Sequence, residues 1–130
     1  MAKVIQVLVA DRPRLLRELV LTALSDQPDI MVDEAADEAD IVAKIKRTTP
    51  DFLVIAQERL NERPRICDIV LRQYPHIRII VVAPHHNHSV FYWASLNIHS
   101  RDLEASEEGL LDVLRSEGKP IWIRDVIRGV

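Results

Sequence analysis

Short, almost wholly apolar runs alternate along the chain with longer segments in which apolar residues recur at helical spacing. An apolar run of five to seven residues is typical of a strand that is buried on both faces of a sheet. The runs predict strands over residues 4–10, 52–56 and 77–83, a second strand that begins at residues 30–32, and a short, weakly signalled fifth strand over 97–104.

The segments between these runs carry apolar residues three and four positions apart, as expected for helices that bury one face. They predict a first helix whose apolar face runs from residue 15 to residue 24, and further helices over residues 38–47, 65–74, 90–96 and 107–115. Pro13 fits the first turn of the first helix, where a missing N–H costs nothing. Asp37 is expected to cap the second helix, and Ile66, Ile69 and Val70 are expected to face the core from the third.

Strands that alternate with helices imply a parallel sheet with helices on both faces. Five such units favour a flavodoxin-like, doubly wound (βα)5 domain with a five-stranded parallel sheet. A (βα)8 barrel needs about 250 residues, and this chain has 130. We expect one domain over residues 1–117, with residues 118–130 as a linker or tail after a Gly-Lys-Pro break.

Composition narrows the function classes. The formal net charge is −3, which gives no electrostatic footprint for nucleic acid or an anionic membrane. We therefore expect no direct nucleic-acid contact and no membrane association. Cys67 is the only cysteine, so no intramolecular disulfide can form, and its apolar helical surroundings predict a small buried side chain. The N-terminus shows no signal-peptide pattern, which favours a cytoplasmic protein.

Ligands of doubly wound sheets bind beyond the carboxyl ends of the strands, so the chemistry is expected around Ala10, Ala56 and Ala83. No glycine lies in a strand-to-helix loop there, which argues against nucleotide, flavin and P-loop chemistry. Cys67 has no histidine close in sequence that would make it a nucleophile. We therefore expect no enzyme activity and no cofactor.

Four segments occur in an order and spacing that resemble the receiver domains of two-component response regulators. They are residues 7–13 (VLVADRP), 49–55 (TPDFLVI), 74–82 (YPHIRIIVV) and 106–111 (SEEGLL). The resemblance spans roughly residues 3–117.

The resemblance implies a pocket that has lost most of its functional groups. The family's first acid is present as Asp11, but Arg12 replaces the second acid, which binds Mg²⁺. Ala56 stands where the family has its phosphoacceptor aspartate, and Ala83 replaces the hydroxyl residue of the fourth strand. The family's lysine has no clear counterpart, with Leu103 nearest to its position. One carboxylate beside a guanidinium cannot supply the oxygen ligands that Mg²⁺ needs, and Ala56 provides no nucleophile.

Arg12 allows two interpretations. Its guanidinium could occupy the vacated metal position and neutralise Asp11, which would lock the pocket in one state. The alternative is an exposed loop arginine in a weak pair, which contributes little to stability.

Two further clusters carry candidate functions. His85, His86 and His88 are of a type that binds Zn²⁺, but no cysteine or acid stands near them at ligand spacing, so we expect a polar loop and no metal. Phe91, Tyr92 and Trp93 cannot all face inward on a helix. At least one of these three is therefore expected on a contact surface.

The tail contains Ile121, Trp122 and Ile123, and it resembles the linker of receivers that precede a helix-turn-helix output domain. Alternatively it packs back on the domain or on a second copy, and Trp122 is then part of the contact surface. The sequence thus predicts a pseudo-receiver that acts in signal transduction by binding a protein partner or itself as a homodimer. The alternative is a sensor whose emptied pocket accepts a small ligand or ion.

Overall fold

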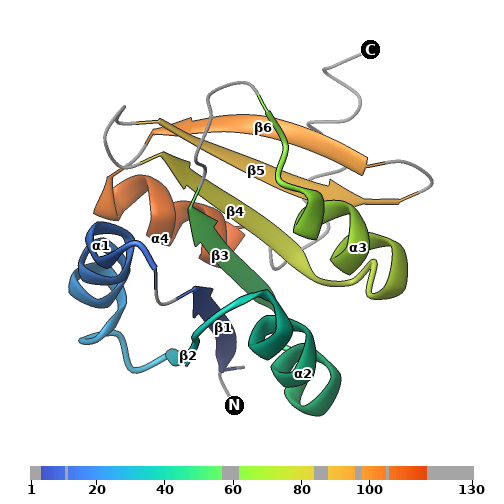
Figure 1. Ribbon diagram of the computed structural model, residues 1–130. Coiled ribbons are helices and arrows are strands. Elements are labelled where there is room, and N and C mark those ends of the chain that lie inside the picture. Colours follow the sequence, from blue (N-terminus) through green and yellow to red (C-terminus); the bar gives the residue numbers. More distant parts are fainter. Residues whose placement is uncertain are drawn as a thin grey trace.

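The sheet has six strands in the order β2-β1-β3-β4-β5-β6 (Figure 1). The computed structural model describes residues 4–10, 12–56, 62–83, 88–95, 98–104 and 106–116. The strands are β1 Ile5–Ala10, β2 Ile30–Ala35, β3 Phe52–Ala56, β4 Arg78–Ala83, β5 His88–Ala94 and β6 Ile98–Glu104. The predicted tail over residues 118–130 lies outside the described residues.

Four helices connect or follow these strands, and they begin and end close to the predicted positions. They are α1 Arg14–Leu24, α2 Glu38–Thr48, α3 Arg65–Gln73 and α4 Glu107–Ser116. Asp37 caps α2 as predicted, because its side chain accepts a hydrogen bond from the Asp40 N–H at 2.8 Å. Thr49 caps the C-terminus of α2, and its left-handed φ of 43° turns the chain away from the helix axis.

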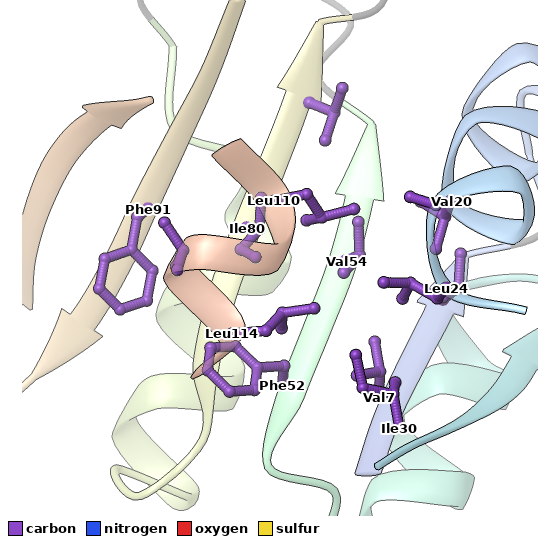
Figure 2. Close-up of a cluster of buried hydrophobic side chains, with 14 of the residues drawn as sticks. Val7, Val20, Leu24, Ile30, Phe52, Val54, Ile80, Phe91, Leu110 and Leu114 are labelled. Carbon is purple, nitrogen blue, oxygen red and sulfur yellow. The ribbon is translucent and has the colours of Figure 1, made fainter. Parts of the chain in front are cut away.

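The sheet is covered on both faces, with α1 and α4 on one side and α2 and α3 on the other (Figure 1). Alternate residues of each strand therefore enter different cores. Figure 2 shows the first core, where Leu110 and Leu114 of α4 and Val20 of α1 pack against sheet residues such as Val54 and Ile80. The second core includes Ile45 of α2, Ile66, Cys67 and Val70 of α3, and Leu53 of the sheet.

Burial of the third helix differs from the prediction at one position. Ile66 and Val70 are 4% and 2% exposed, as expected, but Ile69 is 42% exposed. The buried face of α3 is formed by Ile66, Cys67, Val70 and Leu71, and a turn of about 100° per residue places Ile69 outside that face.

The predicted helix over residues 90–96 is wrong, because residues 90–94 belong to the strand β5. It pairs antiparallel with β4, where Val81 lies opposite Val90, and antiparallel with β6, where Val90 lies opposite Asp102. The predicted fifth strand exists as β6, next to β5 instead of β4. The sheet is therefore six-stranded and mostly parallel, with β5 as its one reversed strand, and the five-stranded, all-parallel (βα)5 arrangement is not found.

The chemistry of the segment explains the difference. Val90, Phe91, Tyr92 and Trp93 are β-branched or aromatic, and such residues are enriched in strands. Only residues 84–87 separate β4 from β5, whereas a parallel crossover needs a dozen or more. The short connection forces the chain to reverse direction, and an antiparallel hairpin results.

Across the described ranges, no helix is both long enough and apolar enough to cross a membrane.

Candidate functional site

Each of the four neighbouring parallel strands β1 to β4 ends in an alanine. These residues are Ala10, Ala35, Ala56 and Ala83. The carboxyl ends of parallel strands meet at one edge of the sheet, which is where ligands of open α/β sheets bind. Because a methyl group is the only side chain at each strand end, this edge has room but no acid, base or nucleophile on the strands themselves.

A hollow of about 530 Å³ lies at this edge over Ala10 and Ala56, between the beginnings of α2 and α3. The chain passes from β1 to β2 on one side and then crosses back to β3 on the other, so β1 and β3 form the topological switch point of the sheet. The lining is partly apolar and includes Ile41, Ile55 and Ile66. Its volume falls within the range of about 300–1,000 Å³ that is usual for small-molecule sites.

Charged side chains surround the hollow. The cationic members are Arg12, Arg63 and Arg65, and the anionic members are Asp37, Glu38 and Glu62. Sequence analysis identified Arg12 but missed Arg63 and Arg65. The signal that could have found them is their place at the start of the helix after the third strand, because that start lies at the carboxyl edge.

Several of these charges are already engaged inside the protein. Arg63 Nε lies 2.7 Å from Asp68 Oδ1, and its guanidinium carbon lies 5.9 Å from the centre of the Tyr92 ring. The ion pair and the cation–π contact together fix Arg63 between α3 and β5. The Asp37 carboxylate accepts the capping hydrogen bond from the Asp40 N–H at the start of α2.

Arg12 is exposed and lies between two hollows. The second hollow, of about 550 Å³, is lined by Arg12, Arg14, Arg17 and Glu34. Arg17 Nε lies 2.5 Å from Glu34 Oε1, and Arg14 Nε lies 3.0 Å from Glu18 Oε1. Asp11 lies outside the described residues, so the predicted neutralisation of Asp11 by Arg12 remains a prediction.

Ala56 and Ala83 lie at the ends of neighbouring strands, β3 and β4, as predicted, and neither side chain offers an oxygen ligand. Asp51 lies at the opposite edge, where it has a structural role. Its carboxylate accepts a hydrogen bond from the Gln6 N–H at 2.9 Å, and its own N–H donates to the Gln6 carbonyl at 2.8 Å. Asp51 therefore holds the start of β3 beside β1 and does not reach the hollow.

The described part of the chain contains no group of three histidine, cysteine or acidic side chains that could hold a metal ion. His88 begins β5, and its Nε2 lies 3.8 Å from Asp102 Oδ1. His85 and His86 fall outside the described residues.

The expected aromatic contact surface is buried within the domain, which corrects that prediction. Phe91, Tyr92 and Trp93 are 1%, 8% and 7% exposed. In a strand, successive side chains point to opposite faces. Phe91 and Trp93 thus enter the core under α1 and α4, and Tyr92 enters the core under α2 and α3. Both faces are covered, so all three rings are buried. Trp122 lies outside the described residues.

No family model, no curated protein and no solved structure matches this chain.

Proposed function

We propose that this chain is an atypical receiver-like domain that acts in signal transduction without aspartyl phosphorylation. Its output is binding to a protein partner or to a second copy of itself. The observation that carries the proposal is the set of alanines at the strand ends, with Ala56 and Ala83 where a receiver needs a carboxylate and a hydroxyl. A phosphoryl group has no acceptor on either strand, so any signal must pass through binding.

The order β2-β1-β3-β4 supports the receiver-like part of the proposal, because flavodoxin-like sheets place their first four strands in this order. We propose that the fold is a variant of that type in which β5 takes the place of a helix. If an output domain follows in the full-length protein, as the tail's resemblance implies, the binding would control transcription through it.

An NMR amide-shift titration with Mg²⁺ and beryllofluoride, a mimic of the phosphoryl group, tests the first half of the proposal. We expect no saturable shifts at Ala10, Ala56 or Ala83. Saturable shifts at these positions would show that the pocket still binds a metal and a phosphoryl mimic, and the proposal would be wrong.

Sedimentation velocity over a wide concentration range tests whether the partner is a second copy. A sedimentation coefficient that rises with concentration indicates self-association. A constant monomer value would exclude the homodimer and leave a different protein as the partner.

A further inference from the structure

The hollow at the β1/β3 edge combines an apolar lining with a charged rim. The lining includes Ala10, Ala56, Ile41, Ile55 and Ile66, which come from four different elements. An apolar ligand body that covers this lining is stabilised there, because apolar surface of both the ligand and the protein is removed from water.

Some of the charged rim residues that the structure describes are already engaged inside the protein. Arg63 is paired with Asp68, Asp37 caps α2, and Glu62 has a partner of its own. Arg12 and Arg65 have no hydrogen-bond or ion-pair partner among the described residues, and both side chains are exposed. Among the described rim residues, Glu38 is an acid with no such partner.

Arg12 and Arg65 reach the hollow from different walls. Arg12 follows β1 and precedes α1, while Arg65 is the first residue of α3. A guanidinium presents a planar fork of N–H donors that matches the two oxygens of a carboxylate. Arg12 and Arg65 are the described rim arginines whose guanidiniums are not already paired, so both can donate hydrogen bonds to one carboxylate.

We infer that this hollow binds a small organic carboxylate, whose apolar body lies on the alanine and isoleucine lining and whose carboxylate is held by Arg12 and Arg65. This goes beyond the proposed function, since binding of such a ligand requires neither a protein partner nor a second copy. It would give the domain an input signal that replaces phosphorylation.

The test uses benzoate as the probe and neutral benzamide as its uncharged analogue of the same shape. The binding is followed in NMR spectra of the whole chain by the amide shifts of Ala36, Ala56 and Ile66. We expect saturable shifts with millimolar benzoate and none with benzamide at the same concentrations.

Substitutions assign the binding to the two arginines. Arg12→Gln and Arg65→Gln should each weaken benzoate binding by about tenfold or more, because each removes a charge-assisted hydrogen bond. Arg47→Gln is the matched control, since Arg47 is also exposed and lies in the last turn of α2, at the other edge of the sheet. It should leave the affinity unchanged.

Four outcomes would overturn the inference. Absence of saturable shifts with benzoate would show that the hollow is not a carboxylate site. Equal binding of benzamide would show a purely apolar site. Tighter binding of inorganic phosphate would point to a site for the phosphate group. Unchanged benzoate affinity in both arginine variants would place the probe elsewhere.

Discussion

Phe91 in β5 lies directly opposite Ile80 in β4, in the antiparallel pairing that reverses the direction of the sheet. On its other side Phe91 pairs with Arg101 of β6, whose guanidinium carbon lies 5.8 Å from the centre of the ring. The ring also stacks on Trp93, with 5.3 Å between the ring centres. Phe91 therefore joins three strands to the core under α1 and α4.

The first prediction concerns the stability that this ring provides. Phe91→Ala should lower the free energy of unfolding by about 3–5 kcal/mol, because it removes a fully buried ring and leaves a cavity. Urea unfolding followed by circular dichroism measures the change. Leu15→Ala is the control, since Leu15 is 41% exposed and should cost about 0.5 kcal/mol or less. A cost for Phe91→Ala as small as that of the control would contradict the placement of β5 inside the sheet.

The strands β1, β3 and β4 and the four helices follow from periodicity, because each helix buries one stripe and each of these strands is an apolar run. The strand β2 begins with the apolar residues 30–32 but continues through Asp33 and Glu34, which the apolar pattern did not include. Residues 90–94 are apolar at every position, and such a run fits a buried helix as well as a strand covered on both faces. The β-branched and aromatic composition of this run favours a strand, and a strand that follows β4 after only residues 84–87 has to be antiparallel.

The candidate site was predictable where it depends on strand ends. Ala10, Ala56 and Ala83 lie at one edge because the strands that carry them are parallel. The participation of Arg63 and Arg65 depends on how α3 packs, which the apolar pattern alone does not give. The prediction of an exposed aromatic surface at Phe91, Tyr92 and Trp93 was wrong, because it assumed that these residues lie on a helix.

A second prediction is that the lost chemistry can be restored. A variant that combines Arg12→Asp, Ala56→Asp and Ala83→Thr regains the family's second acid, phosphoacceptor and hydroxyl, beside the Asp11 that the sequence already has. We expect it to show Mg²⁺-dependent, saturable amide shifts with beryllofluoride. The variant with only Arg12→Asp and Ala83→Thr is the control and should not respond to beryllofluoride. If the triple variant folds and binds neither ion, the correspondence with receivers at these positions is wrong.

A third prediction concerns Cys67, which is 0% exposed in the core under α2 and α3. Burial, as the largest cause, raises the pKa of its thiol from 9.0 to about 12. Because the thiolate is the reactive form, iodoacetamide at pH 8 should not label the native protein, whereas it should label the protein in urea. Mass spectrometry distinguishes the two.

The same pKa shift sets a pH dependence for stability. Well below pH 9.0 the thiol is protonated in both states, so it has no effect on the unfolding equilibrium. Between pH 9.0 and about 12 the unfolded chain releases the proton more readily, so stability falls. Cys67→Ala should remove this part of the alkaline loss. In the labelling experiment, rapid reaction of the native protein with iodoacetamide at pH 8 would contradict the burial of Cys67.

The last prediction concerns the ion pair between Arg115 and Asp29. Arg115 in the last turn of α4 donates to both carboxylate oxygens of Asp29, at 3.1 and 3.2 Å, just before β2 begins. Its Nη2 also donates to Gln27 Oε1 at 2.5 Å. The pair joins residues that are 86 positions apart, so it is formed only in the folded chain.

The hydrogen bond from Arg115 lowers the pKa of Asp29 from its usual 3.8, so the carboxylate stabilises the folded state above that pH. This contribution is lost as the pH falls through the lower, folded-state pKa. Arg115→Ala should therefore destabilise the protein near neutral pH, and the difference from the unmodified chain should shrink as the pH falls below 3.8.

Urea unfolding at neutral pH and at several acidic pH values measures this difference. Arg72→Ala is the matched control, since Arg72 also lies exposed in the last turn of a helix, α3, and has no carboxylate partner among the described residues. It should change stability little at any pH. A loss for Arg115→Ala that is the same at neutral and acidic pH would show that packing of the arginine side chain, and not its pairing with Asp29, provides the stabilisation.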